Sequence, residues 1–265
     1  MAEVTAKMVK ELREMTGAGM MECKKALVAA EGDIQLAIDE LRKAGVKKAA
    51  KKADRETNEG RIVALTEGNK GALVELLCET DFVSGSDKFK EYAADFAKRA
   101  FEFDAEGDIT AAFNEAEQDN LNEVTLIVSE KTVLNRVARW ESAGKIGAYV
   151  HGNGRIGVMV DVEGEIDDET LSDLCMHIAA FAPQYTSPED VDAEFVAKEL
   201  EIAKAQLGDK PANIMENILK GKEAKLYKDV CLTKQPWIKD DKSSFEKVAP
   251  NATIKRFVRW QLGVK

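Results

Sequence analysis

The sequence predicts an α+β protein built from helical segments and antiparallel sheets. Apolar residues recur at helical spacing over 1–45 and again over 187–228. Between these segments, a strand, a Gly-Asn turn, a second strand and a helix follow one another twice along the chain. Two such units indicate a core of two related α+β subdomains with antiparallel sheets.

The length and composition are those of a folded, globular protein with two or three domains. The 265 residues are 45% hydrophobic and 32% charged. The net charge of −10 argues against general nucleic-acid binding, because such binding needs a cationic face that displaces counterions. No apolar run approaches the roughly 18 residues of a membrane span. We therefore expect neither a nucleic-acid partner nor a membrane.

The N-terminus and the cysteines both favour a cytoplasmic protein without a metal. Met1–Thr5 lacks the basic and apolar regions of a signal peptide. The four cysteines are far apart and form no CxxC pair: Cys23, Cys78, Cys175 and Cys231. Scattered thiols fit a reducing compartment and argue against zinc. No cofactor is expected.

Residues 1–45 are predicted to form a three-helix N-terminal domain. Thr5 can cap the first helix, and the stretch 16–19 ends it with two glycines. The second helix begins at Met20, and Asp33 can cap the third. Three helices of this size enclose a small core, so we expect the unit to lean on another part of the protein.

The 46–58 segment is predicted to be a basic linker. Over 42–55, seven Lys or Arg residues stand against one acidic residue, Asp54. With alanines among the charges, the segment is typical of a helical or fraying linker. A nucleic-acid patch is the alternative, which the lack of interleaved aromatic residues disfavours.

Residues 59–140 are predicted to form the first core subdomain, and 141–265 the second. The strands and the helix of the first are expected at 61–66, 72–79 and 89–100. Those of the second are expected at 145–150, 156–162 and 171–179. The segment between the two units, 110–139, is predicted to be helical.

The second subdomain is predicted to carry an inserted helical hairpin at about 187–228. Ser187 and Pro188, followed by two acids, form a typical helix start. The helix is expected to run to Leu207, and a turn at 208–211 leads into the returning helix. Two amphipathic helices joined in this way predict a protruding antiparallel coiled coil. The alternation over 253–262 then predicts a final strand.

The tetrapeptide Thr80-Asp81-Phe82-Val83 stands between the predicted strand at 72–79 and a predicted turn at 84–87. Asp81 and Phe82 could project together there as an acid and an apolar wedge for insertion into a partner. The alternative is that Phe82 is a core residue just after the strand, because buried phenylalanines are common.

No set of residues marks a catalytic site. His151 is at a predicted hairpin turn, and His177 lies within an apolar helix, where a core histidine is the simplest explanation. Neither belongs to an HExxH, GxSxG or P-loop pattern. The glycine-rich stretch 152–157 opens a strand, so it lacks the helix N-terminus that would hold a phosphate. An enzyme with its own active site is therefore not expected.

Several motifs, in their order and spacing, resemble those of a known family. The N-terminal ones are Val9-Lys10-Glu11-Leu12-Arg13, Thr16-Gly17-Ala18-Gly19-Met20-Met21-Glu22-Cys23-Lys24-Lys25-Ala26-Leu27 and Gly32-Asp33 with Ala37-Ile38. The later ones are Glu79-Thr80-Asp81-Phe82-Val83, His151-Gly152, Arg155-Ile156-Gly157-Val158, Met176-His177-Ile178-Ala179-Ala180 and Leu232-Thr233-Lys234-Gln235-Pro236-Trp237. Over nearly the whole chain they resemble bacterial elongation factor Ts, the guanine nucleotide exchange factor of elongation factor Tu.

This resemblance implies a partner and a set of contact residues. It implies that the N-terminal unit is a ubiquitin-associated-like domain, and that Thr80, Asp81, Phe82 and Val83 form the insertion wedge. The wedge would enter elongation factor Tu near its switch region, displace Mg²⁺ and accelerate GDP release so that GTP can bind. The resemblance also implies partner contacts by Arg13, Met20, Met21, Lys24 and His151.

Two other functions stay open at the level of sequence. The first is a chaperone-like module that binds extended peptides through the three-helix domain and the hairpin. The second is an enzyme using His151 with nearby carboxylates, which would need a well-formed apolar pocket at that loop. Members of the resembled family often continue into a C-terminal helical module, whereas this sequence stops at Lys265, so contacts from that module cannot be transferred.

Overall fold

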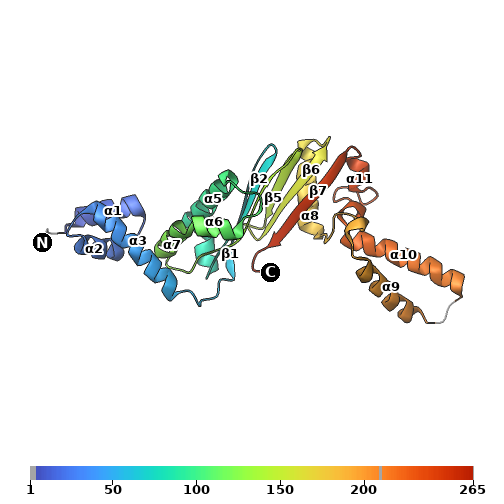
Figure 1. Ribbon diagram of the computed structural model, residues 1–265, viewed down its shortest axis with the longest axis horizontal. Coiled ribbons are helices and arrows are strands. Elements are labelled where there is room, and N and C mark those ends of the chain that lie inside the picture. Colours follow the sequence, from blue (N-terminus) through green and yellow to red (C-terminus); the bar gives the residue numbers. More distant parts are fainter. Residues whose placement is uncertain (1–3, 209–210, 265) are drawn as a thin grey trace.

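The protein is elongated, with three parts arranged along its length (Figure 1). The computed structural model describes residues 4–208 and 211–264. A three-helix unit lies at one end, two antiparallel sheets with their helices form the middle, and a helical hairpin lies at the other end. The predicted α+β class is confirmed. Met1–Glu3 and the predicted turn residues Asp209 and Lys210 lie outside the described residues.

The N-terminal unit begins its helices where the sequence predicted. Its helices are α1 (Ala6–Thr16), α2 (Met20–Ala29) and α3 (Ile34–Lys51). The Thr5 hydroxyl accepts the Met8 N–H at 3.3 Å, and the Asp33 carboxylate accepts the Leu36 N–H at 2.9 Å, so both predicted caps are confirmed. The helix α3 continues to Lys51, so the first half of the 46–58 segment is helical. A helical linker was one of the two forms predicted for this segment.

The three-helix unit packs against α7 (Gln118–Val128), as its small core led us to expect. Leu126 of α7 belongs to the apolar cluster of the unit. At the crossing, a Cβ on Gly45 would lie only 3.0 Å from the Asn122 carbonyl oxygen, so glycine permits the close approach. The Lys48 ammonium donates to the Leu126 carbonyl at 3.2 Å and to the Ser129 hydroxyl at 3.0 Å.

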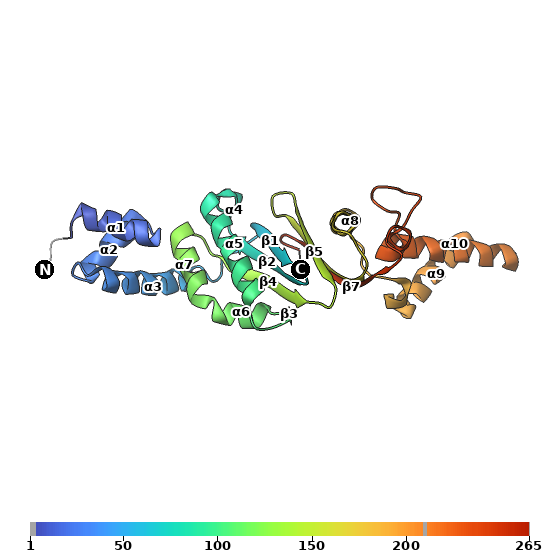
Figure 2. The same cartoon turned by 90° about the horizontal axis from the view of Figure 1, so that it is seen from above.

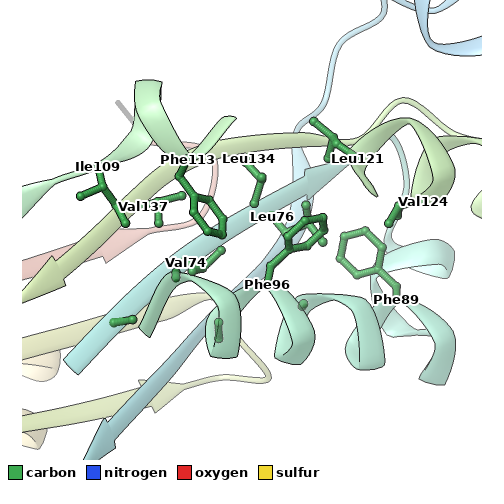
Figure 3. Packing of buried hydrophobic residues seen from close by; sticks show 14 of the residues in the cluster. Val74, Leu76, Phe89, Phe96, Ile109, Phe113, Leu121, Val124, Leu134 and Val137 are labelled. Carbon is green, nitrogen blue, oxygen red and sulfur yellow. The ribbon is translucent and has the colours of Figure 1, made fainter. Parts of the chain in front are cut away.

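The first sheet has four antiparallel strands in the order β1-β2-β4-β3. They are β1 (Glu59–Glu67), β2 (Lys70–Cys78), β3 (Gly107–Asp108) and β4 (Val133–Glu141). Its outer face is covered by α5 (Asp87–Glu102), α6 (Thr110–Ala116) and α7. Figure 3 shows Phe89 and Phe96 of α5, Phe113 of α6, and Val74 and Leu76 of β2 in the buried layer between them.

The prediction of helix throughout 110–139 is wrong for its last part. The helices α6 and α7 end at Val128, and β4 follows. Val133, Leu134 and Val137 have the spacing of a helix face as well as the residue types of a strand, so the local pattern was ambiguous. Pairing with β2 decides the outcome, because that strand supplies the backbone partners of β4.

The second sheet has the order β5-β6-β7 and packs its inner face on the first sheet. Its strands are β5 (Lys145–His151), β6 (Ile156–Gly164) and β7 (Ala252–Gln261), and the helix α8 (Asp168–Phe181) covers its outer face. Both predicted hairpins and the predicted final strand are present. Ile62 and Leu73 of the first sheet and Ile146 and Met159 of the second share one buried cluster.

The two sheets share several features, although the first has four strands and the second has three. Each has a hairpin whose second strand also pairs with a later strand, and each shows a register shift, next to Glu75 in β2 and next to Asp161 in β6. Arg136 of β4 donates to the buried Glu75 carboxylate at 2.6 Å. Arg256 of β7 donates to the buried Asp161 carboxylate at 3.1 Å. The sequence pattern of two related halves therefore extends to a buried ion pair in each.

The helical hairpin projects from the second sheet (Figures 1 and 2). It consists of α9 (Ala193–Leu207) and α10 (Ala212–Val230), which are followed by a 3₁₀ turn (Leu232–Lys234) and α11 (Phe245–Val248). The predicted helix start at Ser187 is wrong, because 188–190 forms a separate 3₁₀ turn and Asp192 caps α9. Val191 is buried at the base of the hairpin, and its extended backbone separates the 3₁₀ turn from α9.

Candidate functional site

The tetrapeptide Thr80–Val83 opens a single helical turn, and the residues of the turn predicted at 84–87 form the end of this helix and the start of the next one. The helix α4 (Asp81–Gly85) follows directly on β2, and Ser86 then caps α5. Thr80 caps α4, since its hydroxyl accepts the Val83 N–H at 3.4 Å. Two caps in series therefore set the direction of the chain as it leaves the sheet.

Phe82 lies on the outer side of α4, with 86% of its surface exposed to solvent. The alternative interpretation of Phe82 as a core residue is therefore wrong. Asp81 beside it is also exposed, whereas Val83 packs against the core cluster under the first sheet and Ser84 is buried. The turn thus has an anchored inner side and an outer side that carries an acid and an aromatic ring.

The carboxylates of Glu130 and Glu79 bind backbone N–H groups around the end of β2. Glu130, in the loop between α7 and β4, accepts the N–H groups of Glu79 and Thr80 at 3.1 and 3.0 Å. Glu79 in turn accepts the Lys131 N–H at 2.6 Å and pairs with Arg55 at 2.9 Å. Partial burial alone would raise the pKa of Glu79, but these hydrogen bonds outweigh it, and the pKa of this carboxyl lies below its usual value.

Sequence reasoning missed Glu130. The residue is 50 positions from Thr80 in the chain, and its loop was assigned to a helical segment. Glu130 lies next to the start of β4, and it reaches Glu79 and Thr80 only because β4 pairs with β2. A prediction of strand at 133–141 would have placed it beside the end of β2.

The predicted N-terminal contact residues are all exposed. Met20 and Met21 begin α2 with exposed fractions of 51% and 62%, and Arg13 and Lys24 are exposed on α1 and α2. The α1–α2 turn lies beside the core helix that follows α4, since a Cβ on Gly17 would be 3.6 Å from the Lys88 side chain. The α1–α2 turn, which precedes Met20, thus contacts the first turn of α5.

His151 ends β5 and is exposed at the hairpin turn, as predicted. Its Nδ1 lies 2.9 Å from the Tyr149 hydroxyl. Both side chains line a surface hollow of about 370 Å³ whose other walls are mostly apolar, formed by Ile156, Met176, Ala179, Ala180, Ile238 and Arg259. Such a hollow suits an apolar side chain of a partner.

The His151 hairpin and α4 lie at the same end of the two sheets. The Gly154 carbonyl, in the β5–β6 turn, accepts the Ile62 N–H of β1 at 2.8 Å. Next to Ile62, the Arg61 guanidinium lies 3.5 Å from the Ser84 carbonyl oxygen of α4. The predicted site residues of the core are thus linked through β1, although 70 residues separate them in sequence (81 to 151).

His177 and the four cysteines are buried in the core. His177 is fully buried, as predicted, and its ring stacks on Phe181 and Trp237 while Nε2 lies 3.0 Å from the Gln235 side-chain oxygen. Burial raises the pKa of the Cys78 thiol to about 12. Within residues 4–208 and 211–264, no three His, Cys, Asp or Glu side chains are grouped in a way that could hold a metal ion. None of the helices in the same ranges is long and apolar enough to cross a membrane.

Comparison with known proteins identifies the family. A family model described as elongation factor TS matches residues 79–264. Proteins named elongation factor Ts from Xanthomonas oryzae pv. oryzae and Nautilia profundicola are 43% and 40% identical to this chain, over 98% and 99% of it and over 92% and 94% of their own lengths. A protein of the same name from Clostridioides difficile is 41% identical over 97% of this chain and 86% of its own length. The resemblance suggested by the sequence motifs is confirmed, and this chain belongs to the elongation factor Ts family.

Proposed function

We propose that this chain is a translation elongation factor that acts as a guanine nucleotide exchange factor for elongation factor Tu, without a catalytic site of its own. The observation that carries the proposal is Phe82, a large apolar side chain that is 86% exposed on a helical turn with an anchored inner side. Exposing such a ring costs free energy in the isolated protein, and insertion into a partner recovers it.

Phe82 supplies the binding energy for opening the partner. Burial of a phenylalanine side chain contributes roughly 1.5–3 kcal/mol. If the receiving slot exists only when the switch region of the GTPase has moved, this free energy favours the moved conformation over the closed one. Anchoring α4 beforehand avoids the entropic cost of ordering it on contact.

Asp81 acts on the nucleotide through charge. GDP in such a GTPase is held by backbone amides and by Mg²⁺, which neutralises phosphate oxygens. A carboxylate brought close to that site competes for the cation or repels its ligands. Once Mg²⁺ is displaced, the phosphates are less neutralised and GDP dissociates faster.

The other two predicted regions hold the partner while the wedge acts. Met20 and Met21 offer flexible apolar side chains flanked by the cations Arg13 and Lys24, a combination that suits a surface with apolar and acidic groups. The hollow at His151 offers a second contact point on the other sheet. Because coupling is reciprocal, incoming nucleotide must in turn weaken this complex, so exchange is accelerated in both directions.

The test is release of labelled GDP from purified elongation factor Tu with and without this protein. We expect release to accelerate at micromolar concentrations of the protein, and excess Mg²⁺ to reduce the acceleration. Unchanged release would contradict the proposal. In that case, binding of unfolded peptides regardless of nucleotide would favour the chaperone-like alternative.

A further inference from the structure

We propose that Glu130 is a positioning residue of the wedge: its carboxylate holds the start of α4 and thereby aims Phe82 at the partner. The inference rests on the proposed function, because the orientation of Phe82 matters only if Phe82 inserts. The Glu130 side chain itself lies under the strand end, where it contacts Glu79 and Thr80.

The Glu130 carboxylate accepts three hydrogen bonds from two consecutive residues. One oxygen accepts the Glu79 and Thr80 N–H groups, and the other accepts the Thr80 hydroxyl at 2.7 Å. These donors belong to the last residues before α4 and therefore have no partner within the helix. The Thr80 hydroxyl, while donating to Glu130, also accepts the Val83 N–H, so the carboxylate orients the cap of α4.

Glu79 in turn binds the backbone of the loop that carries Glu130. Its carboxylate accepts the Lys131 N–H, next to Glu130, and is flanked by Lys52 at 3.6 Å and Arg55 at 2.9 Å. Lys131 in turn donates to the carbonyls of Ala53 and Arg55. The crossed pair Glu79–Glu130 thus joins the end of β2, the loop before β4 and the segment that follows α3.

A five-residue helix needs this external support. A single turn forms too few hydrogen bonds to offset the cost of nucleation, so its orientation depends on what holds its ends. A carboxylate can accept all three bonds at once, whereas the amide of glutamine has one acceptor oxygen and two donor hydrogens. Glu130→Gln therefore leaves at least one of the donors without its partner while conserving size.

Steady-state kinetics of GDP release can separate positioning from general stability. In Glu130→Gln we expect a drop of about tenfold in the maximal rate, the effect of losing one hydrogen bond to a charged group, with KM for elongation factor Tu·GDP within about twofold. The contacts at Met20, Met21 and the His151 hollow keep KM nearly constant. A variant that only reduces the folded fraction lowers the amount of active protein and leaves its KM and the rate per folded molecule unchanged.

A double-mutant cycle with Phe82→Ala provides the decisive readout. If Glu130 acts through the wedge, Glu130→Gln has no further effect on the rate once Phe82 is removed. The matched control is Glu115→Gln, since Glu115 is an exposed glutamate on α6. It should retain the wild-type rate. Thr80→Val, which removes the hydroxyl and keeps the shape, serves as a second variant and should also lower the maximal rate.

A measurement on the isolated protein is independent of exchange activity. Amide hydrogen exchange at Thr80 and Val83 should accelerate in Glu130→Gln, while the amides of β6 keep their protection. A wild-type maximal rate in Glu130→Gln, or full additivity with Phe82→Ala, would overturn the inference while the proposed function stands. No acceleration by the wild-type protein would instead reject the proposed function, on which the inference rests.

Discussion

Phe82 and Phe89 lie seven residues apart and have opposite surroundings. Phe82 is 86% exposed on the outer side of α4, whereas Phe89 is fully buried under the first sheet. Both are phenylalanines that follow β2 in the chain, so residue type alone does not distinguish the buried ring from the exposed one. The distinction comes from the cap at Ser86, which begins a new helix and turns the chain between them.

We predict that Phe82→Ala keeps the fold but loses most of the acceleration of GDP release. Removing an exposed ring should change the free energy of unfolding by less than about 0.5 kcal/mol. The matched control, Phe89→Ala, should lose about 3–5 kcal/mol of stability. Thermal unfolding and GDP release, measured on both variants, check this; an unfolded Phe82→Ala protein would contradict it.

His177 makes stability depend on pH near neutrality. Burial lowers its pKa, and the hydrogen bond to Gln235 only partly opposes this effect. As the pH falls below the unfolded-state value of 6.5, the unfolded chain gains a proton that the folded one does not, so stability falls.

We predict that His177→Phe, which retains an aromatic ring between Phe181 and Trp237, weakens this pH dependence. The difference in slope should be at most about 1.4 kcal/mol per pH unit below the unfolded pKa. Urea unfolding between pH 7.5 and 5.5 measures it, and equal slopes in the two proteins would contradict the prediction.

At the scale of elements, the packing of α3 on α7 joins the N-terminal unit, which carries the proposed contact residues, to the core. The two helices approach at Gly45, and Lys48 and Lys52 donate to carbonyl oxygens at the end of α7. The position of Met20 and Met21 relative to α4 therefore depends on this helix crossing and on the approach of Gly17 to Lys88 of α5.

We predict that Gly45→Leu separates the N-terminal unit from α7. A leucine side chain cannot fit where a Cβ alone would lie 3.0 Å from a carbonyl oxygen. Hydrogen exchange should show lost protection in α7 with the second sheet unaffected. Gly221→Ala is the control, because a Cβ there meets nothing within 4 Å, and it should not destabilise α10.

At the scale of the whole molecule, each sheet carries an arginine whose guanidinium contacts a tryptophan ring of the other sheet. Arg136 lies over the Trp260 ring at 5.0 Å, and Arg256 lies over the Trp140 ring at 4.6 Å. Each guanidinium also neutralises the buried carboxylate of its own sheet. Together with the shared apolar cluster, these contacts make the two halves one unit.

We predict that Arg136→Met and Arg256→Met each destabilise this unit by about 3–5 kcal/mol, since each leaves a buried carboxylate without its partner. Denaturation followed by tryptophan fluorescence should still show one transition, because the halves unfold together. Lys220→Met, which breaks an exposed pair with Glu216 on α10, should cost less than about 1 kcal/mol. Two separate transitions in the wild-type protein would contradict the single unit.

Sequence reasoning located most of the fold and the exposed parts of the candidate site. Caps at Thr5 and Asp33, Gly-Asn turns and strand alternation depend on neighbouring residues, so local patterns were enough. The assignment failed at 133–141, whose spacing also fits a helix, and at 187–192, where burial of Val191 interrupts the helix.

By itself, the sequence determined the α+β class and the strand–turn–strand–helix pattern that occurs twice, because both depend on residues close together in the chain. Its motifs supplied the family resemblance, and the resemblance in turn implied the candidate contact residues. Only the tertiary structure decided that Phe82 faces solvent and that the Glu130 carboxylate binds Glu79 and Thr80 at the start of α4. It also decided that the His151 hairpin lies at the same end of the sheets as α4. These properties depend on pairing between β2 and β4 and on packing of one sheet against the other, which bring together residues distant in sequence.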